Sequence, residues 1–505
     1  MKLHKLNGKA LAVCALIVAI GSTIGAPSTQ AQVGGAAPQS TKGAVVKGRA
    51  PVNKDVLRVK LPRAEETTLP NGLRVVLLRD SKVPTFAAQM VILSGGLADK
   101  SDYRGLASFT AALLREGTTK RSSKDIAEQV DSLGATLNSN SGFSSMTSTV
   151  SSSGLVENLD QTFDLFADVI RNPSFPADEV EKYRTRSLAQ LQFQRSSPQF
   201  LAQERFSRAI YGDHPAAIVA PPVESLKKLS SKDLAAFHST YYRPNNAILA
   251  IVGDVTLKEL LPKIEKAFGD WQKADVPATA IPAAPAQAAS RILLIDRPGS
   301  VQTVLQLGTL GIERNSPDYF SILLADKILG GGPAARLFLN LREDKGYTYG
   351  AYSNFGGSRF RGTWTSVSEV RTDVTEGAMK EFMFELKRLR DEKVSTEELE
   401  NAKRAIVGSF ALSLEQPQSL LQNIITQKLY DLPADYWDTY PQKVAAITVD
   451  DIQKVAQKYI DLDHIQIVAV GDAAKAKDVL AKYGKVEVYD ADGKVVSSSG
   501  EIKNN

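Results

Sequence analysis

The sequence predicts an α+β protein made of two tandem homologous units, each a mostly antiparallel sheet with helices packed on one face. The first observation is an internal repeat: residues 447–472 resemble residues 229–254 at an offset of 218, and residues 396–400 resemble residues 177–181 at an offset of 219. Two separate matches at nearly the same offset indicate a duplicated unit. The second observation is the order of elements, because each unit begins with strands, continues with helices and ends with a helix and a strand.

The first 31 residues have the features of a cleaved signal peptide. A basic segment, residues 1–9, precedes an apolar run over residues 10–20, and Ala31 ends a suitable cleavage site. A membrane anchor is the alternative, and it is less favoured because the apolar run is too short to span a bilayer. A lipoprotein would be acylated at Cys14, but almost no hydrophobic core precedes that residue. We therefore expect a periplasmic or secreted protein.

Composition narrows the classes of function. Of the 505 residues, 43% are hydrophobic and 23% are charged, which is typical of a globular protein. Cys14 is the only cysteine, so the chain without its signal peptide has neither disulfides nor thiolate zinc ligands. The signal peptide holds three lysines and no acid, so its removal lowers the formal net charge from +5 to +2. Such a charge gives no support for nucleic-acid binding. Residues 32–63 are polar and become basic, and we expect a flexible tether there.

The N-terminal unit, residues 64–273, carries clear signals for strands and helices. Two Ser/Thr-rich segments, residues 136–140 and 146–152, predict a hairpin with one wet face, because polar and apolar residues alternate in the second segment. A capped helix and a buried strand over residues 229–254 close the unit. Within residues 67–80, Asn71-Gly72 predicts a turn and the β-branched run after it a strand, and a second strand is predicted at 86–93. Apolar spacing predicts helices at 105–118, 124–133, 158–170 and from 178 past 194.

The C-terminal unit is expected over residues 291–486. Residues 274–290, rich in Ala and Pro, are predicted to be the linker between the units. Residues 334–343 are predicted to form a helix that leads into a strand, and the helix and strand of residues 447–472 repeat the end of the first unit. Residues 487–505 are polar and are predicted to be a frayed tail.

The helix at residues 105–118 carries the most informative pattern. Its sequence, GLASFTAALLREGT, resembles the metal-binding helix of the insulinase/pitrilysin family of zinc peptidases, which includes the mitochondrial processing peptidases. In that family the helix reads roughly GLAHFLEHMLFKGT. Its inverted motif H-x-x-E-H places two His ligands at i and i+4, and the Glu polarises the zinc-bound water. Ser108, Ala111 and Ala112 stand at these three positions here, so the resemblance implies a lost zinc site.

The resemblance covers about residues 64–486 and implies a third zinc ligand, a Glu on the long helix that begins near residue 178. The family spacing falls near residues 188–190, which are Leu, Ala and Gln. No acidic residue lies between Glu181 and Glu204, so a small shift of the alignment does not restore the ligand. We therefore expect no metal and no other cofactor in this chain.

Other chemistries find little support in the sequence. The three histidines outside the signal peptide, His214, His238 and His464, do not lie at ligand spacing from one another, and we expect them to be structural. No G-x-S-x-G motif occurs, so Ser108 is not predicted to be a nucleophile. Residues 330–332 are glycines, but the Gly-Lys-Ser/Thr of a phosphate loop does not follow, and a flexible turn is expected.

Residues 341–350 carry a second pattern of the family, R-E-x-x-x-L-x-Y, which occurs in the half without zinc ligands. In the family this Arg and Tyr project toward the substrate carbonyl held at the other half's zinc. They match Arg342 and Tyr349, which the resemblance implies as catalytic and substrate-binding residues. Tyr347, at the Leu position, is assigned to substrate binding because spacing of two places it on the same strand face as Tyr349. Such donors would stabilise the negative charge that peptide hydrolysis builds on the carbonyl oxygen.

The resemblance implies a zinc-free subunit of a heterodimeric insulinase-like peptidase. Its partner would be a homologous subunit that carries H-x-x-E-H and the zinc, and this chain would form half of a clamshell around a peptide substrate. The substrate is expected to add as a β-strand to an exposed sheet edge. The alternative is a non-catalytic scaffold or peptide-binding protein of the same fold. An autonomous peptidase conflicts with the four lost positions.

Overall fold

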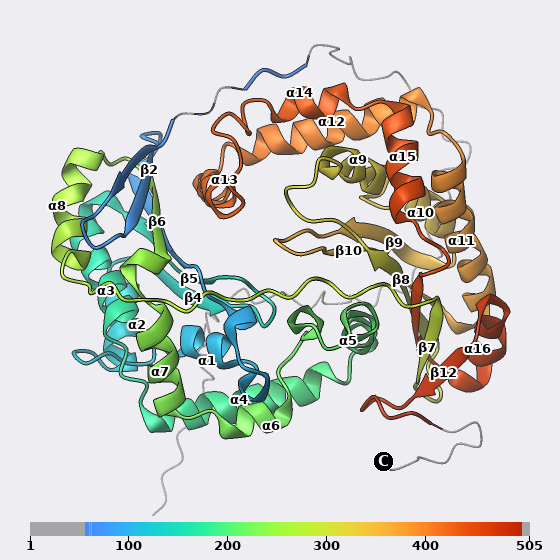
Figure 1. Ribbon diagram of the computed structural model, residues 1–505, viewed down its shortest axis with the longest axis horizontal. Coiled ribbons are helices and arrows are strands. Elements are labelled where there is room, and N and C mark those ends of the chain that lie inside the picture. Colours follow the sequence, from blue (N-terminus) through green and yellow to red (C-terminus); the bar gives the residue numbers. More distant parts are fainter. Residues whose placement is uncertain (1–55, 60, 62, 497–505) are drawn as a thin grey trace, which may run out of the picture. The chain divides into compact units, whose positions relative to one another are not determined.

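Two six-stranded sheets organise the residues that the computed structural model describes, 56–59, 61 and 63–496 (Figure 1). The first sheet has the strand order β1-β2-β6-β3-β5-β4, and only β2 and β6 pair in parallel. Its strands are β1 (Glu65–Thr68), β2 (Arg74–Arg79), β3 (Thr85–Ile92), β4 (Thr136–Ser141), β5 (Ser148–Leu155) and β6 (Ala247–Gly253).

The second sheet has the order β12-β7-β11-β8-β10-β9, in which β7 pairs in parallel with both β11 and β12 and the other pairs are antiparallel. The predicted α+β class with two mostly antiparallel sheets is therefore confirmed. The strands are β7 (Arg291–Asp296), β8 (Gln302–Leu310), β9 (Thr348–Phe355), β10 (Thr363–Arg371), β11 (Gln466–Gly471) and β12 (Val486–Tyr489).

Helices pack around both sheets, and none of the described helices is long and apolar enough to cross a membrane. The first half contains α1 (Leu106–Leu113), α2 (Ser123–Ser132), α3 (Leu159–Arg171), α4 (Ala177–Gln194), α5 (Pro198–Tyr211), α6 (Val223–Lys228), α7 (Ser231–Tyr241) and α8 (Leu257–Phe268). The second half contains α9 (Tyr319–Leu329), α10 (Arg336–Phe338), α11 (Thr375–Asp391), α12 (Thr396–Ser413), α13 (Pro417–Leu429), α14 (Tyr440–Ala446), α15 (Val449–Tyr459) and α16 (Ala473–Leu480).

The internal repeat predicted from the sequence is present as a repeated framework. Helices α7 and α15 each begin with a capping box, in which the side chain of Ser230 or Thr448 accepts a hydrogen bond from the backbone three residues later. Each of these helices leads into the central strand of its sheet, β6 or β11. The long helices α4 and α12 are each followed by a helix that begins with Pro-Gln, at Pro198 and Pro417, again at an offset of 219.

The hairpin predicted from the Ser/Thr-rich segments is formed by β4 and β5, which pair antiparallel. In β5, Ser148, Val150 and Ser152 are buried, whereas the residues between them are partly exposed. The alternation that predicted one wet face is therefore confirmed.

Helices α5 and α13 each cover the second face of a sheet in the other half of the chain. Leu201, Phe206 and Ile210 of α5 form one core with β7, β8 and β11. Leu421 and Ile425 of α13 form another core with β2, β3 and β6. As a result, every residue of β6 and of β11 is buried. The prediction of helices on one face of each sheet is incomplete for this reason: hydrophobic runs reveal that a strand is buried but not which distant segment buries it.

The start of the described chain contacts the C-terminal half. The backbone amide of Leu61 donates to Asp438 Oδ1 at 3.0 Å, and Arg63 forms an ion pair with the same carboxylate at 2.6 Å. Val59 packs against the core of the C-terminal sheet. Leu61 and Arg63, at the end of the tether predicted over residues 32–63, thus have fixed partners. Residues 1–55, which include the predicted signal peptide, lie outside the described residues.

Order at the C-terminal end continues past residue 486, where the sequence predicted a tail. Residues 486–489 form β12, parallel to β7, and Val495 bridges to Tyr489 after a turn. The prediction of a frayed tail is wrong for residues 487–496, and residues 497–505 are not described. The strand was not predicted because the alternation of Val486 and Val488 with Glu487 is short and its neighbours are polar.

One buried ion pair joins α10 to α12. Arg336, whose side chain is 5% exposed, donates from Nε to Glu398 Oε1 at 2.8 Å and from Nη2 to Oε2 at 3.1 Å. The backbone amide of Ser395 also donates to Glu398. Burial raises the pKa of Glu398, but the hydrogen bonds from Arg336 and Ser395 outweigh it and lower the pKa to about 2. The charged form of Glu398 therefore stabilises the fold.

Because α13 of one half covers the sheet of the other half, shortening one of its buried side chains should destabilise the protein. Leu421 is 3% exposed, and Leu421→Ala should lower the free energy of unfolding by about 2–5 kcal/mol because it leaves a cavity between α13 and the N-terminal sheet. The matched control is Leu412→Ala on α12, since Leu412 is 75% exposed and its loss should change stability by less than about 0.5 kcal/mol. Urea unfolding measures both. Equal stabilities of the two variants would contradict the packing of α13.

The Arg336–Glu398 pair predicts a pH-dependent effect. Glu398→Gln should cost about 2–3 kcal/mol at neutral pH, because a buried guanidinium loses its charged acceptor. Since the pKa of Glu398 is lower in the folded state than its ordinary value of 4.5, the stabilisation is present above pH 4.5 and is lost as the pH falls toward 2. The difference in unfolding free energy should close over that window. Glu400→Gln, on the same helix but half-exposed, is the control.

Candidate functional site

Helix α1, which carries the degenerate zinc motif, is fixed at its start by a buried carboxylate. Gly105 adopts φ 98°, and Asp99 accepts hydrogen bonds from the amides of Gly105 at 2.7 Å and Ala107 at 2.9 Å. Burial raises the pKa of Asp99 to about 7. At the other side of the helix, the hydroxyl of Ser139 donates to the carbonyl of Ala111 at 2.6 Å and ties α1 to strand β4. The helix thus keeps a rigid framework.

The residues at the family's zinc positions do not fit a zinc ion. Ala111 is fully buried, Ser108 and Ala112 are half-buried, and together they offer two methyl groups and one hydroxyl. In α4, Leu188 packs against the N-terminal core where the family has its third ligand. Zinc sites are built from imidazole, thiolate and carboxylate groups. Among the residues that the structure describes, no group of three or more His, Cys, Asp or Glu is placed to hold a metal.

The three histidines considered as ligands lie in separate places. His214 accepts a hydrogen bond at Nδ1 from the amide of Ala216, and its Nε2 lies 2.9 Å from the carbonyl oxygen of Pro282. His238 Nε2 lies 2.7 Å from the carbonyl oxygen of Ile170, and burial lowers its pKa to about 4. His464 Nδ1 lies 2.7 Å from Asp461. His214 therefore holds the segment between the two halves, residues 274–290, through Pro282.

Arg342 lies on an irregular turn that follows α10. Residues Leu339–Asp344 form a π-helix, a rare winding that often occurs at functional sites. The side chain of Arg342 is 35% exposed, and its guanidinium lies over the ring of Phe338, with Cζ 4.7 Å from the ring centre. Its nearest acid is Glu343 at 3.6 Å, and its buried Nε has no hydrogen-bond acceptor. The ring of Phe338 thus supports the partly exposed guanidinium.

Neighbouring side chains anchor this π-helical turn. Asn340 donates from Nδ2 to Glu381 at 3.0 Å and to Glu385 at 2.8 Å, both on α11. Arg336 fixes the preceding residues to α12. These anchors were not predicted from the sequence, in which the i, i+4 spacing of the two acids on one helix face is their only signal. They restrict the motion of the backbone that carries Arg342.

Tyr349 is the most exposed large apolar side chain in the described part of the chain, at 81%. It lies near the start of β9, at a bulge where Thr348 pairs with Val370 and Ala351 with Ser368. Tyr347 precedes the strand, is partly buried against the C-terminal core, and packs on Gly377. The predicted common face of Tyr347 and Tyr349 is therefore wrong, because Tyr347 lies before β9 begins and packs against the core, whereas Tyr349 is exposed. Tyr347 supports the core, and Tyr349 points into solvent.

Strands β4 and β9 form edges of the two sheets. The amide of Val156 donates to the carbonyl of Pro84, so the even-numbered residues of β5 bond to β3 and the odd-numbered ones to β4. In β4, the backbone groups of Leu137, Ser139 and Ser141 consequently point away from the sheet. Arg115 donates to the carbonyl of Leu137 at 2.7 Å, which occupies one of them. The outward groups of Ser139 and Ser141 give this edge the capacity to pair with an extended peptide.

The edge at β9 is closed at one point by the glycine-rich turn of residues 330–332. The amide of Ser353 donates to the carbonyl of Gly330 at 3.0 Å. A Cβ at Gly330 would lie 2.2 Å from the nitrogen of Ser353, so glycine is required for this approach. The turn therefore has a structural explanation, in agreement with the rejection of a phosphate loop.

Comparison with known proteins identifies both halves. Residues 74–220 match the family model "Insulinase (Peptidase family M16)", and residues 228–406 match "Peptidase M16 inactive domain". The uncharacterized zinc protease YmxG of Bacillus subtilis is 24% identical over 355 residues, which are 70% of this chain and 85% of the relative. An uncharacterized zinc protease of Streptomyces coelicolor is 25% identical over 401 residues, 77% of this chain and 86% of the relative.

Solved structures give the same assignment. The crystal structure of a peptidase M16 inactive domain from Pseudomonas fluorescens has a TM-score of 0.76 and 27% identity, and the match covers 81% of this chain and 98% of that one. A protease from Helicobacter pylori has the same fold, with a TM-score of 0.76, 22% identity, and coverage of 82% and 100%. Together with the two family models, which match well over half of the chain, these similarities show that the chain belongs to the insulinase-like family of M16 peptidases.

Proposed function

We propose that this chain is the zinc-free subunit of a heterodimeric M16 peptidase and contributes Arg342 and Tyr349 to a site whose zinc belongs to the partner. One observation carries the proposal. The positions of the family's metal ligands hold Ser108, Ala111 and Ala112, whereas the family's Arg and Tyr are retained as the partly exposed Arg342 and the exposed Tyr349. A subunit that had lost all function would not need an exposed phenol and a partly exposed guanidinium at these positions.

In this proposal the two side chains act on the carbonyl oxygen of the bond being cut. The Tyr349 hydroxyl and the Arg342 guanidinium donate hydrogen bonds to that oxygen as it gains negative charge. Arg342 is suited to the role because the ring of Phe338 supports its planar group while leaving donors free. Tyr349 is suited because its ring extends from the start of an edge strand. The metal chemistry that activates water would come from the partner subunit.

The same proposal assigns peptide binding to a sheet edge. The outward backbone groups of Ser139 and Ser141 on β4 would pair with an extended segment of the substrate, as in strand addition to other sheets. The hydrogen bond from Arg115 to the carbonyl of Leu137 occupies this edge at one end and limits the length that a peptide could pair with. A non-catalytic scaffold would need neither this edge nor the exposed donors, and the experiments below distinguish the two.

The lost zinc positions predict that the purified chain alone binds no stoichiometric zinc. The reason is that Ser108, Ala111, Ala112 and Leu188 offer no ligand set for the metal. The measurement is elemental analysis after dialysis against buffer with a trace of zinc, with and without prior treatment with a chelator. One tightly retained zinc per chain would overturn the assignment of a zinc-free subunit.

The proposed donors predict a selective loss of activity in Tyr349→Phe and Arg342→Lys. Each variant is mixed with a homologous subunit that carries H-x-x-E-H, and both association and peptide hydrolysis are measured. Removing one such donor should lower kcat about a hundred- to thousandfold, since it costs about 3 kcal/mol of transition-state stabilisation. Arg342→Lys keeps the charge but loses the planar fork. Association should be unchanged in both variants.

The control for this experiment is Tyr352→Phe. Tyr352 lies on the same strand and is also exposed, but its ring packs beside Phe338, and no catalytic role is proposed for its hydroxyl. Tyr352→Phe should retain full activity. Full activity in Tyr349→Phe and Arg342→Lys as well would leave the scaffold as the better description of the chain.

A further inference from the structure

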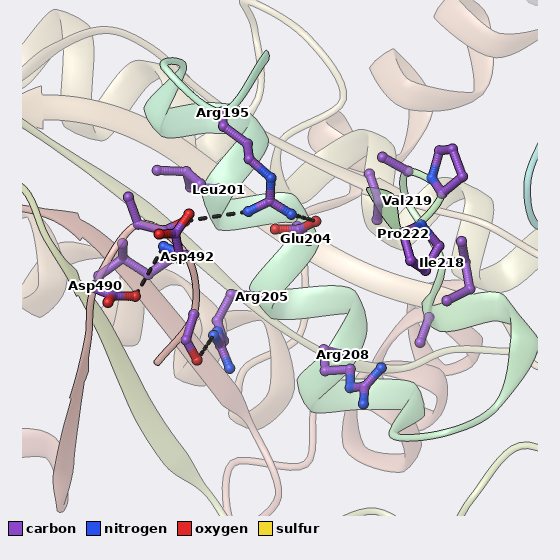
Figure 2. A pocket seen from close by; sticks show the side chains of 16 residues that line it. Arg195, Leu201, Glu204, Arg205, Arg208, Ile218, Val219, Pro222, Asp490 and Asp492 are labelled. Carbon is purple, nitrogen blue, oxygen red and sulfur yellow. Dashed lines mark hydrogen bonds and ion pairs between the residues drawn. The ribbon is translucent and has the colours of Figure 1, made fainter. Parts of the chain in front are cut away.

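A cavity of about 400 Å³ lies beside α5, and its polar side chains hold the turn that follows β12 (Figure 2). Arg205 donates to the carbonyl of Gly493 at 3.0 Å, and the carboxylate of Asp490 accepts a hydrogen bond from the amide of Asp492 at 3.0 Å. Side chains thus bond backbone groups of an irregular segment. The bulge in β9 is held in the same way, and there the segment carries Tyr349.

The bulge decides the direction of Tyr349. Tyr349 and Gly350 of β9 together face the single residue Glu369 of β10. Side chains of a regular strand alternate between its two faces, and further along β9 both Ala351 and Ser353 are buried. Counted back by two residues, a regular strand would bury Tyr349 as well, yet its side chain is 81% exposed. The extra residue of the bulge therefore turns the phenol outward.

Two hydroxyl groups bond the backbone of this bulge. The hydroxyl of Thr348 donates to the carbonyl of Glu369 at 2.7 Å and accepts a hydrogen bond from the amide of Gly350 at 3.1 Å. The hydroxyl of Ser368, a buried residue of β10, donates to the carbonyl of Gly350 at 2.9 Å. A bulge disrupts the regular hydrogen bonds between two strands. The two side chains supply partners for the carbonyl of Glu369 and for both backbone groups of Gly350.

The bulge belongs to the edge strand of one sheet only. Strand β10 pairs with β8 from Thr363 to Arg371 without a shift, so the irregularity is confined to the pairing of β9 with β10. In the N-terminal sheet the edge strand β4 pairs with β5 over residues 136–141, also without a shift. The framework of the duplicated unit therefore does not require a bulge at this edge. Its place beside Tyr349 indicates a local role, since bulges commonly re-aim a side chain.

We propose that Thr348 and Ser368 are positioning residues for Tyr349, because their hydroxyls hold the bulge that turns the phenol away from the core. Neither side chain touches the substrate in this scheme, and both act only through the direction of Tyr349. The catalytic meaning of this role rests on the function proposed above, in which the phenol donates to the substrate carbonyl. The hold on the bulge itself needs no partner subunit, so it is measurable on the chain alone.

The first measurement follows the direction of Tyr349 in the purified chain. A fluorotyrosine is incorporated at position 349 alone, and its fluorine resonance is recorded with and without a soluble gadolinium chelate, which broadens the signals of exposed nuclei. Thr348→Val and Ser368→Ala, made separately, each remove one hydroxyl with little change of shape. In each variant the broadening should fall roughly threefold or more, because the phenol is no longer held outward. Thr348→Ser, which keeps the hydroxyl, should behave as the unmodified chain.

The matched control for this measurement is Thr365→Val. Thr365 also lies on β10 opposite β9, but its hydroxyl lies 3.4 Å from Asn354 Oδ1 and takes no part in the bulge. Thr365→Val should leave the fluorine signal unchanged, and circular dichroism establishes that each variant is folded. The role fails for either residue, Thr348 or Ser368, whose folded variant keeps the broadening of the unmodified chain. It also fails if Thr365→Val has the same effect, or if Thr348→Ser does not preserve the signal.

The second measurement separates positioning from general support of the fold. In complex with a subunit that carries H-x-x-E-H, Thr348→Val should lower kcat by up to roughly a hundredfold with little change in KM, because the donor is misplaced rather than removed. Added to Tyr349→Phe, Thr348→Val should lower kcat no further, since both changes act through one hydroxyl. Additive losses would overturn the positioning role.

The two measurements also distinguish this role from the proposed function. If the fluorine signals change as expected but no complex with such a subunit hydrolyses peptides, the hold on the bulge stands and the proposed function fails. If Tyr349→Phe abolishes hydrolysis while Thr348→Val changes neither the fluorine signal nor kcat, the proposed function stands and the positioning role fails.

Discussion

The reciprocal packing of α5 and α13 is the constraint on which the rest of the structure depends. Each half of the chain forms a sheet whose central strand is apolar on both faces, and each half supplies the helix that covers the other's second face. Each buried Leu, Ile or Phe side chain of these helices contributes about 1.5–3 kcal/mol relative to an exposed one. Neither sheet is completed by its own half, so the described chain is expected to unfold cooperatively rather than half by half.

This exchange also connects the candidate site to the fold. Helix α13 follows α12, which holds Arg336 through Glu398, and Arg336 begins the short α10 that leads into the π-helical turn of Arg342. The position of Arg342 thus depends on a chain of contacts that reaches the opposite sheet. Tyr349 lies on the edge strand that follows. In such a site the backbone is anchored and only the ends of the side chains are exposed. This arrangement suits hydrogen-bond donors that must be in place before a substrate binds.

The two halves show how a duplicated framework acquires different chemistry. The positions that bury α5 and α13 are apolar in both copies, for example Leu201 and Leu420, whereas several of the adjoining, less buried positions differ, for example Arg208 and Gln427. The sheets also differ at the strand beside β2 and β7. In the first sheet this strand is β1, antiparallel and from the start of the described chain, and in the second it is β12, parallel and from its end. Packing constraints preserve one set of residues and leave the other free to change.

Much of the fold could be predicted from the sequence, since its signals are local. Alternation gave the β4–β5 hairpin, capping residues such as Ser230 and Thr448 gave helix starts, and the internal repeat gave two homologous halves. Contacts between distant segments could not be predicted, because spacing within α5 or α13 does not identify the sheet that each covers. The bulge at Tyr349 and Gly350 was missed for a related reason: it is set by the pairing of β9 with β10.

The candidate site was predictable only in part. Arg342 and Tyr349 were identified from a resemblance, and the structure adds their exposure and supports, while their catalytic roles stay predictions. Asn340 and its two glutamates were not foreseen, because the i, i+4 spacing of the two acids does not show that a turn forty residues earlier donates to them.

The helix exchange has a consequence for the chain while it is being synthesised. All strands of the N-terminal sheet have been synthesised once residue 253 has been made, but the helix that covers their second face begins at Pro417. At typical rates of synthesis of about 5–20 residues per second, that apolar face stays uncovered for on the order of ten seconds. Throughout this time Ile248, Ala250 and Val252 are open to other nascent chains and to chaperones. The same packing that makes the unfolding of the finished protein cooperative therefore leaves this apolar face exposed to aggregation during synthesis.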